Sequence, residues 1–426
     1  MTSKIVLKQV SILGAPAVDI EIQDGLITSI GSASDSGGQV MQCKGLVALP
    51  GFVDLHTHLR EPGRENSETI ETGSKAAARG GYVAVSAMAN TLPVADTAAI
   101  VEQVRNIGSS VGLVDVFPIG AVTKGLAGVE LSDIGSMASS KAKVRVFSDD
   151  GHCVWDPLVM RRALEYVKQF DGVIAQHAQE PRLTEKSQMN EGSVSATLGL
   201  KGWPAVAEES IIARDILLAN MLDARLHICH VTTRGGVEII RWAKGQGMKV
   251  TAEVTPHHLL LTDESAISFD PIYKVNPPLR TQDDVDALRS ALVDGTIDIV
   301  ATDHAPHPVE DKECEWESAA FGMVGLETAF SIVYSTLVAN GSMSWDRLAD
   351  VMSIAPAAIG RYSNHGHKLE VGGPAHITIV DPEGTMTVDR EKLHSKSRNT
   401  PFHGMNFQGT VVATIFNGHF THKVGE

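Results

Sequence analysis

The chain has 426 residues, long enough to bury a large core and to form more than one structural unit. Hydrophobic residues make up 43% and charged residues 20%, which is typical of a folded enzyme and excludes a disordered or fibrous chain. The net charge of −15, without a cluster of lysine or arginine, argues against nucleic acid or an anionic membrane surface as a partner.

Cysteine usage and the start of the chain predict a cytoplasmic protein. The cysteines are far apart and form no CxxC pair, which argues against a disulfide framework and a thiolate zinc site. They are Cys43, Cys153, Cys229 and Cys314. The first residues lack a basic segment followed by an apolar one, and no long apolar run occurs, so we expect neither a signal peptide nor a membrane span.

Both ends of the chain have the pattern of short β-strands. The runs rich in β-branched residues are 4–12, 18–23, 26–30, 375–380 and 409–416. Tight turns at Asp24-Gly25 and Asn417-Gly418 separate neighbouring runs. We therefore expect a small β-sandwich domain assembled from both termini, residues 1–52 and 361–426, around a central domain of residues 53–360.

The central domain alternates strand-like apolar runs with helical stretches such as residues 67–79 and 210–222. The strand candidates are residues 47–55, 82–87, 114–119, 144–147, 173–176, 224–229, 249–254 and 297–301. Eight strands that alternate with helices predict an α/β fold of the (β/α)8 TIM-barrel type rather than a doubly wound sheet.

Histidine and aspartate follow five of these eight strands, and in such a barrel the chemistry lies at the carboxyl ends of the strands. The residues are His56 and His58, Asp149-Asp150, His177, His230 and Asp303. A lone histidine is more often a satisfied or exposed side chain. Because so many ligand types converge on one face, the pattern predicts a metal site, and imidazole with carboxylate favours zinc.

One tetrahedral zinc ion takes fewer ligands than this set offers, which implies either a second ion or residues of the set that act in catalysis instead, and two ions are favoured. We expect one ion on His56, His58 and Asp303, the other on His177 and His230, and a bridging carboxylate from Asp150. A water shared by the ions would lose its proton near neutral pH and act as the nucleophile. Asp303 would then carry the proton.

Several longer motifs strengthen the interpretation. They are residues 51–63 (GFVDLHTHLREPG), 88–91 (MANT), 147–151 (FSDDG), 227–231 (HICHV), 274–280 (KVNPPLR), 301–307 (ATDHAPH) and 397–402 (SRNTPF). Together they resemble the dihydroorotase family of the amidohydrolase superfamily over nearly the whole chain. The resemblance implies a zinc-dependent hydrolase of cyclic amides that interconverts L-dihydroorotate and N-carbamoyl-L-aspartate in pyrimidine synthesis.

The resemblance also implies which residues hold this dianionic substrate. The matching positions are His58, Arg60, Asn90, Asn276, His307, Phe321 and Gly322. An arginine offers a planar fork that matches a carboxylate. The alternatives are a loop salt bridge of Arg60 with Glu61 or Glu65, an exposed loop histidine at His307, and a turn residue at Asn276.

Strand four differs from many members of the superfamily, which bridge their metals with a carbamylated lysine. Here Lys143 lies too early in the strand, and Asp149 and Asp150 end it. The spacing to His177 in the family favours Asp150, although Asp149 remains the other candidate. An aspartate at this place resembles one bacterial branch of the dihydroorotases and argues against a dihydropyrimidinase or hydantoinase.

Other features and functions remain open. His257, His258 and His304 stay unassigned, and the acidic loop 308–318 is either a cover over the site or a solvated loop. Another cyclic-amide hydrolase, such as an allantoinase or dihydropyrimidinase, is one alternative function. A non-catalytic subunit that assembles aspartate transcarbamoylase is a further alternative, and association with that enzyme or with further copies of the chain is possible for the enzyme as well.

Overall fold

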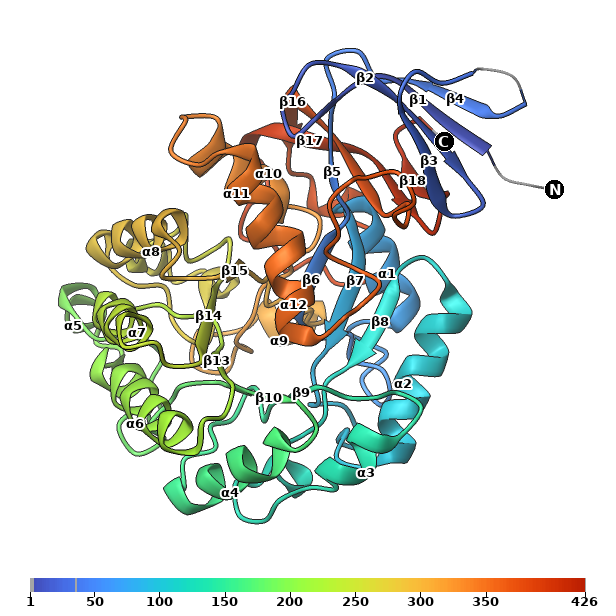
Figure 1. Cartoon of the computed structure of the whole chain (residues 1–426). Coiled ribbons are helices and arrows are strands. Elements are labelled where there is room, and N and C mark those ends of the chain that lie inside the picture. The colour runs from blue at the N-terminus through green and yellow to red at the C-terminus, as the bar shows by residue number, and fades with distance from the viewer. Residues whose placement is uncertain (1–3, 35–36, 426) are drawn as a thin grey trace.

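The computed structural model describes residues 4–34 and 37–425 (Figure 1). It shows a barrel of parallel strands with helices around it, and a β domain to which both ends of the chain contribute. The predicted fold class is therefore confirmed. Among the described residues, no helix is both long and apolar enough to cross a bilayer.

The barrel strands are close to the predicted ones. They are β6 Phe52–Thr57, β7 Tyr82–Ala87, β8 Asp115–Pro118, β9 Val146–Phe147, β10 Val173–Gln176, β13 Leu226–Ile228, β14 Val250–Val254 and β15 Ile299–Val300. Parallel ladders join β6 to β8 and β9 to β15. Single bridges between Gly120 and Phe147 and between Thr57 and His304 connect the two ladders. All eight carboxyl ends therefore open on one face.

Helices cover the outside of the barrel (Figure 1). The α-helices are α1 Ile70–Arg79, α2 Ala98–Val111, α3 Ile134–Ser139, α4 Pro157–Lys168, α5 Ser193–Leu198, α6 Val206–Leu222, α7 Arg234–Gly245, α8 Gln282–Asp294, α9 Val309–Lys312, α10 Ala329–Val333, α11 Trp345–Ala349 and α12 Ala355–Gly360. The 3-10 helices are η1 Lys124–Leu126, η2 Asp263–Ser268, η3 Pro271–Tyr273 and η6 Arg390–Lys392, and the π-helices are η4 Tyr334–Val338 and η5 Asp350–Ile354. The two-residue strands β11 Met189–Asn190 and β12 Gly202–Trp203 pair with each other.

The β domain brings strands from both ends of the chain into one folded sheet, seen as blue and red arrows at the top of Figure 1. Its strands are β1 Lys4–Ile12, β2 Val18–Gln23, β3 Leu26–Gly31, β4 Gln39–Gln42, β5 Val47–Pro50, β16 Ile377–Thr387, β17 Asn406–Phe416 and β18 His419–Lys423. The first part of β1 pairs with β2, whereas Ser11 and Ile12 pair with β5. Ile20 and Ile415 belong to the core cluster shared by the two layers, as a sandwich requires.

The predicted first barrel strand, residues 47–55, is in fact two strands. β5 pairs with β16 in the β domain, and β6 pairs with β7 in the barrel. The chain changes partners at Gly51, where a Cβ atom would lie 2.6 Å from the side chain of Val83. The sequence pattern misses the break because both strands are fully buried, so the apolar run continues across it.

Phe52 joins the barrel to its outer layer, and its removal should destabilise the protein. The ring is fully buried and lies 5.8 Å from the rings of Tyr82 and Phe330. We expect Phe52→Ala to lower the free energy of unfolding in urea by about 3–5 kcal/mol. Leu217→Ala, at a side chain that is 55% exposed, is the control and should change it by less than about 0.5 kcal/mol. Equal unfolding midpoints for Phe52→Ala and the wild type would contradict this account.

Candidate metal centre

The carboxyl ends of the barrel strands bring together all six predicted metal ligands. They are His56, His58, Asp150, His177, His230 and Asp303, and each side chain is buried. His56 lies within β6, and the others follow β6, β9, β10, β13 and β15. A strand end is rigid, so the side chains keep a fixed geometry.

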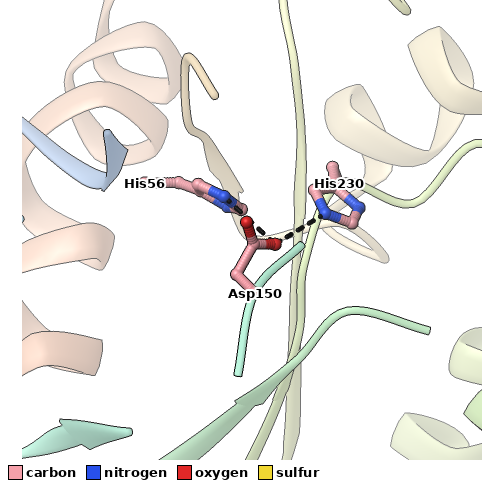
Figure 2. A group of neighbouring side chains, drawn as sticks. All are labelled: His56, Asp150 and His230. Atoms are coloured by element: carbon pink, nitrogen blue, oxygen red, sulfur yellow. Dashed lines mark hydrogen bonds and ion pairs between the residues drawn. The ribbon is translucent and has the colours of Figure 1, made fainter. Parts of the chain in front are cut away.

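Asp150 is the centre of one group of ligands (Figure 2). Its Oδ1 lies 3.2 Å from Nε2 of His230 and 3.4 Å from Nε2 of His56. Nδ1 of His177 lies 3.3 Å from the same oxygen and 3.0 Å from Nε2 of His230. The Nε2 atoms of His56 and His230 and this carboxylate oxygen lie close together and form a donor set that fits a cation.

Asp303 is the centre of the second group. Its Oδ1 lies 3.0 Å from Nε2 of His58 and 3.5 Å from Nε2 of His56. His56 thus belongs to both groups. Its Nε2 is buried and has no hydrogen-bond partner among the residues that the structure describes. An unsatisfied nitrogen between two carboxylates is an expected feature of a metal ligand.

The charges in this cluster favour positive charge between the two carboxylates. Burial by itself disfavours an ionised Asp150, but His56, His177 and His230 hold the pKa of its carboxyl well below the usual range. Burial likewise opposes a charge on His56, yet Asp150, Glu253 and Asp303 together raise its pKa well above the usual value. The carboxylates therefore hold positive charge in their midst, either as protons on imidazole or as a metal ion.

The neighbouring carboxylate, Asp149, is occupied elsewhere. It accepts hydrogen bonds from the backbone N–H groups of Val122 and Thr123, at 2.7 and 2.9 Å, and from the Thr123 hydroxyl. Asp149 therefore fixes the loop that follows β8. The geometry favours Asp150 over Asp149 as the ligand.

Glu253 on β14 is part of the site but was not predicted. Its Oε1 lies 2.5 Å from Nδ1 of His56, and its Oε2 lies 3.0 Å from Nε2 of His227. A carboxylate on Nδ1 holds the proton there and directs the lone pair of Nε2 toward the metal position. The available signal was an acidic residue inside an otherwise uncharged strand, Val250–Val254.

Gln179 has the same role for His177. Its Oε1 lies 2.8 Å from Nε2 of His177, which leaves Nδ1 to face Asp150. The side-chain amide of Asn276 lies 3.5 Å from the same Gln179 oxygen. Oδ1 of Asn276 is buried and has no hydrogen-bond partner among the described residues, so this predicted substrate-binding residue has an acceptor to offer.

Arg60 lies beside the metal ligands with its charge uncompensated. Its Nε donates to the carbonyl of Pro306 at 3.1 Å, and Nη2 lies 3.4 Å from Nε2 of His307. Burial lowers the pKa of Arg60 to about 10, so the guanidinium stays charged at neutral pH. Within the described chain no carboxylate lies within 4.0 Å of it, and the salt bridge with Glu61 or Glu65 is not formed.

The other predicted substrate-binding residues surround this arginine and the metal ligands. Nε2 of His307 lies 2.8 Å from the carbonyl of Phe321, and Gly322 follows in the same segment. Oδ1 of Asn90 lies 3.0 Å from Nδ1 of His58, and its amide donates to the Asp150 carbonyl. His307 is largely buried rather than an exposed loop residue, and burial lowers its pKa to about 2.

Two of the unassigned histidines have structural partners. Both ring nitrogens of His258 are occupied, by the Thr255 hydroxyl and the Pro277 carbonyl. Nε2 of His304 faces Glu68 at 3.2 Å. His257 is the exception among the three unassigned histidines, since its Nε2 is buried without a partner in the described chain and burial lowers its pKa to about 4.

Comparison with known proteins identifies the family of the chain. A family model described as dihydro-orotase-like matches residues 45–236. A dihydroorotase of Streptomyces coelicolor is 59% identical over 98% of both chains, and one of Mycobacterium tuberculosis is 56% identical over 96% of both. The chain belongs to the dihydroorotase family.

Solved structures show that the fold of this family member is shared more widely. An L-hydantoinase (dihydropyrimidinase) of Arthrobacter aurescens is 26% identical and superposes with a TM-score of 0.86 over 100% of this chain and 97% of that one. A dihydropyrimidinase of Brevibacillus agri superposes with a TM-score of 0.84 over 99% and 95%, at 24% identity. The barrel with its β domain is thus common to several cyclic-amide hydrolases.

Asp150→Asn and Asp149→Asn should separate the two adjacent carboxylates. We expect Asp150→Asn to weaken metal binding about 100-fold, because the residue contacts all four histidines. Asp149→Asn should keep the metal and lose about 1–3 kcal/mol of stability through its broken hydrogen bonds. Metal titration against a chelator and urea unfolding provide the two measurements. Loss of the metal in the Asp149 variant alone would reverse the assignment.

Proposed function

We propose that the chain is a zinc-dependent, cytoplasmic dihydroorotase that interconverts L-dihydroorotate and N-carbamoyl-L-aspartate in pyrimidine synthesis. Relatives that are 54–59% identical over nearly the whole chain bear that name. The observation that carries the proposal is the buried, uncompensated Arg60 next to the histidine and aspartate cluster. A cationic pocket beside a metal centre suits a small anionic substrate whose ring is to be hydrolysed.

The six ligands fit two zinc ions better than one. The two groups of donors, around Asp150 and around Asp303, share His56 and are all buried. Bound zinc would polarise the ring carbonyl and lower the pKa of a water. Asp150 touches donors from both groups, since it lies 3.4 Å from His58 and 3.2 Å from His230, and it is therefore the proposed bridge.

Asp303 is the proposed proton carrier. Burial favours its neutral form, but His56 and the hydrogen bond with His58 lower its pKa, so Asp303 is ionised, which is the form that can take up a proton. Its backbone φ of 47° is strained for a residue other than glycine, which is common where a side chain is held for catalysis. In hydrolysis Asp303 takes a proton from the attacking water and delivers it to the leaving ring nitrogen as the C–N bond breaks.

Substrate orientation falls to the residues beside Asp303. We assign the substrate carboxylate to Arg60 and His307, with Asn90 beside them. Asn276 and the backbone of Phe321 and Gly322 complete the proposed pocket with neutral donors and acceptors. In the reverse direction the same contacts hold N-carbamoyl-L-aspartate in the folded form that closes the ring.

The alternatives predict different results for the same protein. A non-catalytic assembly subunit would not need six converged ligands, and an allantoinase or dihydropyrimidinase would not need the Arg60 pocket. Association with aspartate transcarbamoylase or with further copies of the chain stays a prediction. Metal analysis together with a panel of dihydroorotate, dihydrouracil and allantoin tests the proposal. Zinc and turnover of dihydroorotate support it, and hydrolysis of only the uncharged rings would overturn it.

Asp303→Asn should abolish turnover while the protein stays folded. The amide keeps the size of the side chain but cannot carry the proton, so we expect kcat to fall by about 10³-fold or more. Zinc content, measured on the same sample, distinguishes loss of the proton carrier from loss of the metal. Undiminished kcat would contradict the assigned role.

Arg60→Met should weaken substrate binding. Loss of a charged hydrogen-bond partner of the carboxylate is expected to lower kcat/KM for dihydroorotate about 10- to 100-fold. Arg64→Met is the matched control, since Arg64 is exposed and only four residues away. Equal kinetics for the two variants would remove Arg60 from the pocket.

A further inference from the structure

The loop that follows β15 carries three of the proposed substrate-binding residues, His307, Phe321 and Gly322. Its two ends are tied together, because the N–H of Ala305 donates to the carbonyl of Met323 at 2.8 Å. Between these ends the loop has acidic exposed residues but also the large buried side chains of Lys312 and Trp316. The loop is therefore anchored from inside and is not simply a solvated acidic segment.

Lys312 forms the inner anchor. Lys312 is 4% exposed, and its ammonium donates to the carbonyls of Lys274, Ala320 and Gly322, at 3.1, 2.9 and 3.1 Å. No carboxylate of the described residues lies within 4.0 Å of it. A buried ammonium without a counter-ion is stable only when its three donors are all satisfied, so these carbonyls must stay in place.

Lys274 joins its own segment to the loop at a second place. Its ammonium donates to the carbonyls of Trp316 and Glu317, at 2.6 and 3.1 Å, and lies 4.4 Å above the ring of Phe321. Its own carbonyl accepts both the Lys312 ammonium and the N–H of Gly322. The segment that leads to Asn276 is thus joined to the loop by hydrogen bonds at residues 316–317 and at Gly322, and by a cation–π contact at Phe321.

This cross-link reaches the proposed substrate pocket directly. The Phe321 carbonyl accepts from His307, whose Nε2 also faces Arg60. At Gly322 the backbone lies so close to the His307 ring that a Cβ atom would be 2.9 Å from Nε2. A shift of residues 320–322 would therefore displace His307 and the donors beside Arg60.

We propose that Lys312 is a positioning residue for substrate binding, because its ammonium fixes the segment 320–322 against the segment 274–276 and thereby holds His307 beside Arg60. The inference rests on the proposed function, since it assumes that these residues hold the substrate carboxylate. Lys312 touches no metal ligand and, in this account, does not contact the substrate.

Lys312→Met tests the proposal, because it keeps the length of the side chain and removes the ammonium. We expect KM for dihydroorotate to rise about tenfold with kcat changed less than about threefold, as for lost ground-state binding. Backbone amides of residues 309–322 should exchange hydrogen faster, while zinc content stays unchanged. Lys392→Met, at a side chain that is 78% exposed, is the matched control and should match the wild type in all three measurements.

The alternatives give distinct results. A lower kcat with unchanged KM would show only a smaller active fraction and would overturn the positioning role, as would unchanged exchange in residues 309–322. If Lys312→Met does not fold, the same measurements are made on Lys274→Met, for which we expect KM to rise about threefold. Absence of dihydroorotate turnover in the wild type would contradict the proposed function but not the role of Lys312 in the loop. The hydrogen-exchange measurement would then test by itself whether the ammonium orders the loop.

Discussion

The structure depends on two carboxylates, Asp150 and Asp303, that are buried among four imidazoles. Neither acid has solvent to stabilise its charge, and each raises the cost of the other's ionisation. Only positive charge held between them removes that cost. The strand ends, the backbone strain at Asp303 and the carboxylate of Glu253 behind His56 all serve to hold donors around that charge.

Two buried cationic side chains, Lys312 and Arg60, differ in how many of their hydrogen-bond donors the protein itself satisfies. The ammonium of Lys312 donates three hydrogen bonds, all to backbone carbonyls of the protein itself. Arg60 has five N–H donors, yet its one protein carbonyl in the described chain is that of Pro306. A charge that the fold satisfies completely is part of the framework, whereas a charge left with free donors awaits a ligand.

The sequence predicted the barrel and the convergence of the ligands because both follow from local rules. Strand periodicity counts the strands, and parallel strands bring their carboxyl ends to one edge. Glu253 escaped prediction because its importance depends on His56, a residue far away in the chain. The break at Gly51 escaped because burial on both sides of it gives one unbroken apolar run. Lys312 escaped because a lysine within an acidic loop has the composition of a solvated surface.

The pairing of β5 with β16 has a consequence for how the protein is made. β5 ends two residues before β6, the strand that carries His56, but its neighbour β16 begins only at Ile377. A ribosome therefore finishes all eight barrel strands and all six candidate ligands before β16 emerges to pair with β5. The β domain is thus the last part of the fold that can close, whereas the barrel that carries the ligands can form earlier.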